Sequence, residues 1–204
     1  IQQLPDNGSR WNLARDMFMF SFYSMGMNSI DIFNCDKPKS GRIIYERSKT
    51  KDRRDDNALM VVDINPEMLQ IIEKYKGIDK LFNFYKRYAG HEEFNTAINK
   101  GLKQIEKYLR DDFDKKIEDK KISEDSEFEF ENLQFYCARH TWATYALNQC
   151  GIDKYTVHEC LNHIVPETKI TDIYIDKDWS RINNANRTVL DNLKKTETTN
   201  KLEE

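Results

Sequence analysis

The stretch Leu133–Thr144, "LQFYCARHTWAT", places two basic residues, Arg139 and His140, side by side inside a run of apolar and aromatic residues. Such a run predicts a buried helix, and burying a charge without a partner is strongly unfavourable. Arg139 therefore needs either an acidic partner or an anion that binds beside it. The residues on both sides of this stretch bear on that choice.

Helical patterns surround this stretch. Apolar residues recur at helical spacing over residues 11–26 and 92–110, and shorter helices are predicted over 29–33, 66–77, 137–151 and 153–163. Between the first helices, "RIIYERSKT" (42–50) and "ALMVVDI" (58–64) predict two strands joined by a charged turn. The sequence thus predicts a mainly α-helical domain with a small antiparallel β-sheet (α+β).

The charges are unevenly distributed. The 204 residues carry a net charge of −3, which by itself does not indicate a nucleic-acid-binding protein. Residues 36–54, however, hold eight Lys or Arg against three acids, and residues 111–131 hold ten acids against four lysines. These counts predict a basic face of net +5 and a solvated acidic segment of net −6.

Cysteine usage and hydropathy indicate a reduced, cytoplasmic chain. The four cysteines form no CxxC pair, which favours free thiols. No signal-peptide pattern is present, and no apolar run approaches the roughly 20 residues that span a bilayer. The sequence begins at Ile1 without a methionine, which favours a fragment of a longer protein.

Five polar residues gain meaning when they are considered together. Arg47 and Lys49 lie two apart on a predicted strand and so share a face, and Arg139, His163 and Tyr174 follow later in the chain. Individually, an ion-pair arginine, an exposed lysine and a core tyrosine would be ordinary. Together, guanidinium groups can hold phosphate oxygens, a lysine can protonate a leaving alkoxide, and a tyrosine can act as nucleophile. This set indicates phosphodiester chemistry.

A zinc site is not predicted. "HECLNH" places His158 and His163 five residues apart, or about 140° around a continuous helix, so the two side chains would not face one metal. His140 is expected to be a buried structural histidine, and His91 a capping or surface residue. The sequence predicts neither a metal nor another cofactor.

The order "RSKT … ARHTWAT … LNH … IYID" resembles the catalytic domain of the tyrosine recombinases, or phage integrases, and is closest to the branch found in mobile elements of Bacteroidetes. The resemblance runs from about Leu13 to about Asp176. It implies the catalytic-domain fold of that family and site-specific DNA recombination through a 3′-phosphotyrosyl intermediate, without metal or ATP. It also implies roles for four residues: Tyr174 attacks the phosphate, Lys49 protonates the leaving oxygen, Arg139 holds the phosphate oxygens, and His163 either helps to deprotonate Tyr174 or bonds the phosphate.

Three departures from the family pattern concern the site. In "MGMNSIDI", Asn28 occupies the place of the usual first arginine, and Tyr136 replaces the first histidine of the H-x-x-R box. His163 and Tyr174 are separated by eleven positions, slightly more than is usual. Arg47 is the favoured substitute for the missing arginine. Its rival Arg15 is expected to form a structural ion pair with Asp16 or another acid.

The resemblance also implies domains and partners. It makes residues 1–186 the catalytic domain and residues 187–204 a polar tail, flexible or exchanged between protomers, and it places an N-terminal DNA-clamping domain outside this fragment. The implied partner is double-stranded DNA, bound by a bacterial cytoplasmic, nucleoid-associated protein that is a homotetramer on DNA and a monomer alone, with room for a DNA-bending accessory protein. The expected DNA-backbone contacts are Lys37, Lys39, Arg42, Lys51, Arg53 and Arg54.

Two other functions remain open at this level. Asn28 and Tyr136 also suit a catalytically degenerate relative that binds DNA or a partner protein without cutting. A type IB topoisomerase-like relaxing enzyme would share the same chemistry.

Overall fold

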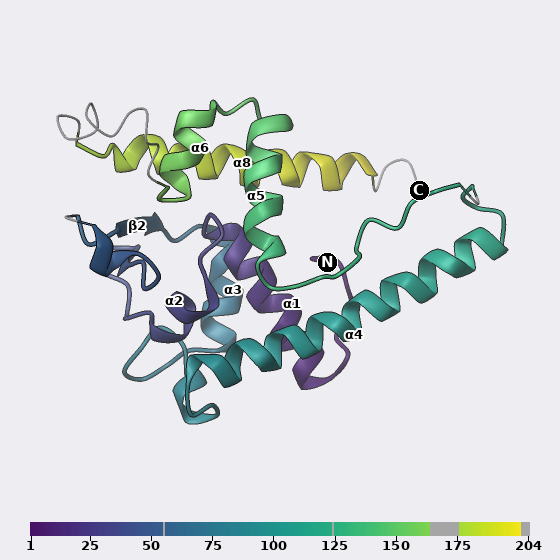
Figure 1. The fold of residues 1–204 in the computed structure, drawn as a ribbon, viewed down its shortest axis with the longest axis horizontal. Helices are drawn as coiled ribbons and strands as arrows, with labels where there is room; N and C mark the ends of the chain where they lie inside the picture. Colours follow the sequence, from purple (N-terminus) through teal and green to yellow (C-terminus); the bar gives the residue numbers. More distant parts are fainter. Residues whose placement is uncertain (55, 124, 164–175, 201–204) are drawn as a thin grey trace.

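The computed structural model describes residues 1–54, 56–123, 125–163 and 176–200. It is mainly helical with one two-stranded antiparallel sheet, which confirms the predicted fold class (Figure 1). The elements follow in the order α1 (Gly8–Tyr23), α2 (Ser29–Asn34), β1 (Arg42–Glu46), the 3₁₀ turn η1 (Lys51–Arg53), β2 (Leu59–Asp63), α3 (Pro66–Lys74), the 3₁₀ turn η2 (Phe84–Lys86), α4 (His91–Glu118), α5 (Cys137–Asn148), α6 (Lys154–Cys160) and α8 (Trp179–Asn200).

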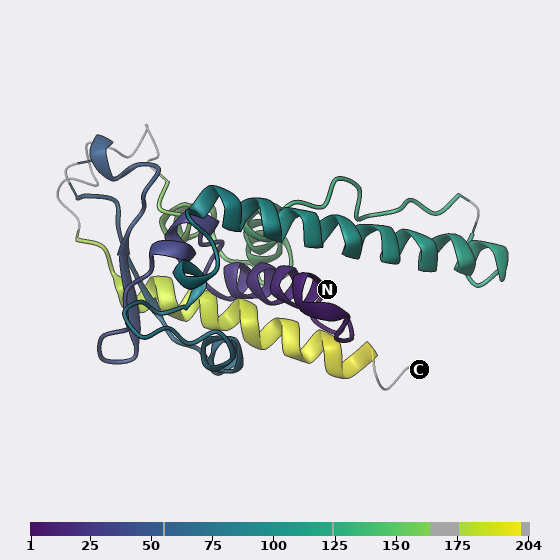
Figure 2. The same ribbon diagram turned by 90° about the horizontal axis from the view of Figure 1, so that it is seen from below.

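Helix α1 is the centre of the core. From Trp11 to Tyr23 nearly every side chain is buried, and Figure 2 shows the helix lying between α4 and α8. The helix ends just before Gly26, whose φ of +75° is accessible to glycine at little cost and whose N–H donates to the Ser21 carbonyl at 2.7 Å. The predicted helix over 11–26 is therefore confirmed in its position and its stop signal.

Helix α4 is longer than expected. The helical pattern was predicted over residues 92–110 and a solvated acidic segment after it, but the helix continues to Glu118, supported by an Asp112–Lys116 pair at 2.8 Å. Its distal half projects beyond the other helices (Figures 1 and 2). The returning chain packs on this half, with Phe128 against Phe113 and the Arg110 guanidinium 4.2 Å from the Phe128 ring centroid. We call residues 111–131 the acidic arm.

The sheet is shorter than predicted. The β1–β2 ladder runs from the pair Arg42↔Asp63 to the pair Glu46↔Leu59, so Arg47 lies just past its end. Helix α8 covers the sheet edge: the Asn183 side chain accepts a hydrogen bond from the Asp63 N–H and donates one to the Val61 carbonyl. Because these bonds satisfy backbone groups of the edge strand, a sheet of two strands can be stable here.

The predicted polar tail differs from the structure. Residues 187–200 form the second half of α8, with Val189 and Leu190 buried in the core and Arg187 paired with Glu67 of α3 at 2.7 Å. Two apolar residues at the right position on a helix are enough to dock an otherwise polar segment. The segment up to Asn200 is thus part of the packed domain rather than a separate extension.

Two further features follow the sequence closely. The Asp153 side chain accepts from the Thr156 N–H at 2.9 Å and so caps α6, and Gly151 has a φ of +65° beyond the end of α5. The cysteines are all free thiols, with Cys35 and Cys160 buried. Within the described residues, no helix combines the length and apolarity needed to cross a lipid bilayer.

Candidate active site

The Arg139 side chain is buried, with 5% of its surface exposed, and its guanidinium is held by backbone carbonyls. Nη1 donates to the Gly26 carbonyl at 3.1 Å, and Nη2 donates to the Leu161 carbonyl and lies 3.1 Å from His163 Nε2. These neutral acceptors orient the guanidinium without forming an ion pair with it. Arg139 Nε has no hydrogen-bond partner among the described residues.

Arg47 is a second buried arginine, near enough for its charge to act on Arg139 and His163. Only 6% of the residue is exposed, and its Nε also lacks a partner among the described residues. Burial and the nearby Arg47 charge lower the pKa of Arg139. In the part of the chain that the structure describes, neither arginine forms an ion pair with a carboxylate. The two groups therefore form a buried cluster of like charge, which an anion would stabilise.

His163 completes this cluster as a neutral ring. Its partial burial, followed by the charges of Arg139 and Arg47, lowers its pKa to about 4. Because an arginine N–H only donates, Nε2 of His163 must be the acceptor in the contact with Arg139. The ring proton is therefore on Nδ1, which makes His163 a hydrogen-bond donor through that atom.

The predicted relation between His158 and His163 is wrong in its geometry. Helix α6 ends at Cys160, and the chain turns so that the two ring centroids lie 5.7 Å apart. The 140° separation assumed a helix that continued through His163. Among the described residues, no group of three or more His, Cys, Asp or Glu side chains is arranged to hold a metal ion.

Asp31 and Tyr45 are site residues that the sequence reasoning missed. Asp31 in α2 is buried, accepts the Ser48 N–H at 2.9 Å through Oδ1, and has no partner for Oδ2 among the described residues. Burial and the Asp31 charge raise the pKa of Tyr45, which also senses both arginines. A signal was available in "SIDIF", where an acid stands in an apolar run just as Arg139 does.

Lys49 does not share a face with Arg47, contrary to the prediction. The ladder ends at Glu46 and the chain turns back, with the Thr50 and Lys51 N–H groups both donating to the Arg47 carbonyl. This turn leaves Arg47 buried and Lys49 exposed.

Lys49 instead lines a neighbouring pocket of about 550 Å³. Asn28, Ser48 and Tyr136 line the same pocket, so the structure brings Lys49 together with the two residues that depart from the family pattern. Ser48, between Arg47 and Lys49 in the chain, connects the pocket to the buried cluster. The predicted residues thus form two adjacent groups rather than one.

His140 is exposed, so the expectation of a buried histidine is wrong. Its ring packs edge-on against the Tyr136 ring, with centroids 4.8 Å apart. One helical position after the buried Arg139, the side chain turns outward. His91, the first residue of α4, is half-buried and pairs with Glu92, in keeping with a capping or surface role.

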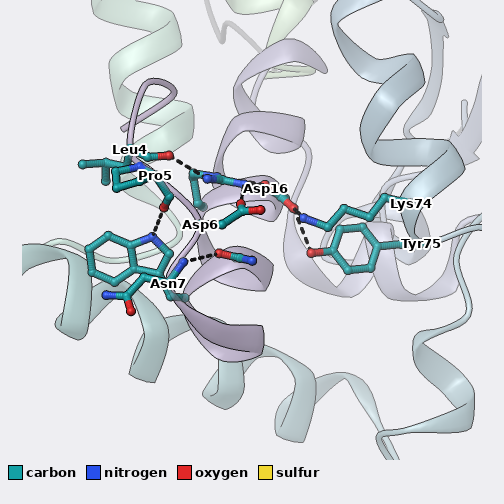
Figure 3. A network of polar contacts seen from close by, with 10 residues as sticks. Leu4, Pro5, Asp6, Asn7, Asp16, Lys74 and Tyr75 are labelled. Carbon is teal, nitrogen blue, oxygen red and sulfur yellow. Dashed lines mark hydrogen bonds and ion pairs between the residues drawn. The ribbon is translucent and has the colours of Figure 1, made fainter.

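Arg15 is occupied elsewhere, as the sequence suggested. Its guanidinium contacts Asp6 at 2.8 Å and Asp16 at 3.0 Å, and it donates to the Leu4 carbonyl. Figure 3 shows that Asp16 in turn receives bonds from Lys74, the last residue of α3, and from Tyr75, which follows it. This network ties the N-terminal segment, α1 and α3 together, so Arg15 is a structural residue and not a substitute for the missing arginine.

The predicted DNA contacts divide into two classes. Lys37, Lys39, Arg42 and Arg53 are exposed and Lys51 is half-buried, although Arg42 also pairs with Asp63 at 2.8 Å. Arg54 has only 11% of its side chain exposed and contacts Asp56 and the Asn162 carbonyl, so it is not available as a surface cation. Tyr174 lies outside the described residues.

Comparison of the chain with models of known families, with curated proteins and with solved structures gives no match.

Proposed function

We propose that this domain cleaves and rejoins DNA strands by the chemistry of the tyrosine recombinases. The observation that carries the proposal is the buried pair Arg47 and Arg139, which has no carboxylate partner among the described residues. Two adjacent guanidinium groups at low dielectric repel each other, and a phosphodiester is the anion whose oxygens match their planar donors. Motifs from distant parts of the chain meet at this pair, which supports the family resemblance.

In this proposal, Tyr174 supplies the nucleophile. Its phenolic oxygen gives its proton to water and attacks the scissile phosphorus, the bond from phosphorus to the 5′ oxygen breaks, and Lys49 gives a proton to that oxygen. A 3′-phosphotyrosyl link and a free 5′-hydroxyl result. Attack by a 5′-hydroxyl on this link reverses the step, so the phosphodiester energy is retained and ATP is not needed.

The two arginines and His163 act on the phosphate itself. Arg47 and Arg139 bind the non-bridging oxygens, whose negative charge must be stabilised in the transition state. His163 donates from Nδ1 to one of these oxygens, since its Nε2 is already used by Arg139. This assignment favours phosphate binding over proton abstraction from Tyr174, the other role that the sequence left open.

Covalent capture of DNA tests the proposal. A nicked suicide substrate traps the phosphotyrosyl product, which is measured as a protein–DNA adduct on a denaturing gel. We expect the unsubstituted protein to form the adduct and Tyr174→Phe to form none while still binding DNA. Tyr108→Phe is the matched control, because Tyr108 is exposed on α4 and its edge contact with Trp11 needs only the ring. Adduct formation by Tyr174→Phe would refute the assignment of Tyr174 as the nucleophile.

A non-cutting DNA-binding module is the second candidate. Asn28 and Tyr136 stand where the family pattern has an arginine and a histidine, and both line the pocket beside the cluster, so this site would hold fewer cationic groups than an active recombinase. The two functions separate on Arg47→Ala: loss of adducts with retained DNA affinity supports cleavage, whereas absence of adducts from the unsubstituted protein on every cognate site supports binding alone. Comparing supercoil relaxation with recombination between two sites distinguishes a topoisomerase.

A further inference from the structure

Asn162, the residue before His163, forms hydrogen bonds through both polar atoms of its side chain and through its main-chain carbonyl. Its side-chain Nδ2 donates to the Ala58 carbonyl at 2.8 Å, its Oδ1 accepts from Lys177 Nζ at 2.7 Å, and its main-chain carbonyl accepts from Arg54 Nη1 at 3.1 Å. The residue is 3% exposed. Three partners from two distant parts of the chain therefore fix one buried asparagine.

Asp56 connects two of these partners. Its carboxylate receives Arg54 Nε at 2.7 Å and lies 3.2 Å from Lys177 Nζ. Burial alone would raise the pKa of Asp56, but hydrogen bonds from Arg54 and Ala58 and the Lys177 charge outweigh it and lower the pKa well below its ordinary value. We call Arg54, Asp56, Asn162 and Lys177 the clasp.

The backbone of Asn162 needs such support. Its φ is +53°, in the left-handed region that is unfavourable for residues other than glycine, although asparagine tolerates it better than most. Such a conformation persists when the surroundings over-determine it. This backbone turn sends the following residue back toward Arg139, where the His163 ring meets the guanidinium.

We propose that the clasp is a positioning device for His163, holding the ring against Arg139. It joins the β1–β2 connection, through Arg54, Asp56 and Ala58, to the end of α6 and to Lys177. The contact between the two side chains is a property of the fold. The effect on DNA cleavage rests on the proposed function.

The pKa of His163 shows whether its ring lies beside the two arginines. Partial burial lowers the pKa of His163 to about 4, together with the groups that face the ring among the described residues, Arg139, Arg47 and His158. If the clasp is broken and the ring leaves the guanidinium groups, its pKa should rise toward the ordinary 6.5. NMR titration of the four histidines measures this value, with the His163 signal assigned from His163→Gln.

The variants are Asn162→Gly, Lys177→Met and Lys177→Arg. Glycine keeps the backbone conformation and removes the side-chain bonds, methionine removes the charge of Lys177, and arginine retains a donor. Lys116→Met is the matched control, since it removes a lysine from an ion pair on the distal half of α4. We expect the first two to raise the His163 pKa by at least one unit, Lys177→Arg to restore most of the low value, and the control to leave it unchanged.

Adduct formation supplies the second readout. We expect Asn162→Gly and Lys177→Met to slow covalent capture roughly ten-fold or more at unchanged DNA affinity, as small misplacements in an active site do. An unchanged His163 pKa in both variants, or an ordinary pKa in the unsubstituted protein, overturns the clasp. A raised pKa with unchanged capture overturns its role in the reaction. If the variants raise the His163 pKa but no protein, including the unsubstituted one, forms adducts, the clasp is supported and the proposed function is refuted. If Lys177→Met does not fold, Asn162→Gly decides.

Discussion

The side chain of Arg139 lies directly on the backbone of Gly26: a Cβ added at Gly26 would come within 2.4 Å of Arg139 Cγ. The same glycine has a φ of +75° and accepts a hydrogen bond from Arg139 Nη1. Gly26, which follows the end of α1, thus also lies against the buried side chain of Arg139. Stability and site geometry are therefore coupled at this position.

Gly26→Ala should destabilise the protein more than backbone strain alone explains. Gly41 has the same φ of +75° and nothing within 4 Å of an added Cβ, so Gly41→Ala isolates the strain, about 1–2 kcal/mol. Gly26→Ala adds a clash with Arg139, for which we expect roughly 1–3 kcal/mol more. Denaturant unfolding measures both. Equal losses for the two variants would mean that Arg139 can move away without cost.

The like-charged pair should make stability depend on anions. Sulfate, which carries the same tetrahedral oxygens as phosphate, should raise the unfolding midpoint of the unsubstituted protein more than that of Arg47→Met, by linkage to binding at the cluster. Without the anion, Arg47→Met should be neutral or stabilising by about 1–2 kcal/mol, because removing one buried charge relieves repulsion. Thermal unfolding in sulfate and in chloride at equal ionic strength is the measurement.

The control for this anion effect is Arg42→Met, since Arg42 is exposed and paired with Asp63. It should respond to sulfate as the unsubstituted protein does. A sulfate response that survives Arg47→Met would place the anion site elsewhere.

Glu67 should make the docking of α8 sensitive to acid. Burial raises its pKa, but hydrogen bonds from Arg187 and Lys194 outweigh this effect and lower the pKa to about 2. A carboxyl with a lowered pKa in the folded state stabilises above its ordinary value of about 4.5, and this contribution is lost as the pH falls toward 2. Glu67→Gln should therefore lower the free energy of unfolding at pH 7 by about 1–3 kcal/mol, and by less at pH 3.

Glu73→Gln is the comparison for Glu67, because Glu73 lies on the same helix and pairs with Lys76 at an exposed position. We expect less than about 1 kcal/mol at either pH. Equal effects of the two substitutions would argue that α8 does not depend on Glu67.

Truncation should distinguish a docked helix from a tail. Ending the chain after Asn186 removes Arg187 and the buried Val189 and Leu190, each apolar side chain worth about 1.5–3 kcal/mol of burial. We expect this chain to unfold at clearly lower denaturant concentration, whereas one ending after Asn200 should match the full chain. Equal midpoints would restore the interpretation of residues 187–200 as a dispensable tail.

Local patterns predicted most of the elements but not their ends. Gly26 ends α1 through its own backbone conformation, and Asp153 caps α6 through its own side chain, so both roles could be predicted from the sequence. The end of α4 was not, because the Asp112–Lys116 pair supports a helix whose composition resembles a solvated loop. The docking of Val189 was missed because its burial depends on core residues that are far away in the sequence.

The candidate site divides in the same way. The contact between Arg139 and His163 agrees with the expectation that these residues act together, an expectation that rested on their joint chemistry and on the family resemblance. The separation of Lys49 from Arg47 could not be predicted from alternation along a strand, because the ladder ends one residue before Arg47. Asp31 was missed because its hydrogen-bond partner is the backbone N–H of Ser48, and a sequence pattern of side chains does not predict a bond to a backbone group.

The acidic arm and the β1–β2 connection lie at opposite ends of the long axis in Figure 1. Residues 111–131 carry net −6 and residues 36–54, which include β1 and most of this connection, carry net +5, so the two segments place opposite charges along that axis. A polyanion attracts one pole and repels the other, with a reach set by the Debye length, about 8 Å at physiological salt. The chain would thus approach such a partner with the β1–β2 connection facing it and the acidic arm pointing away.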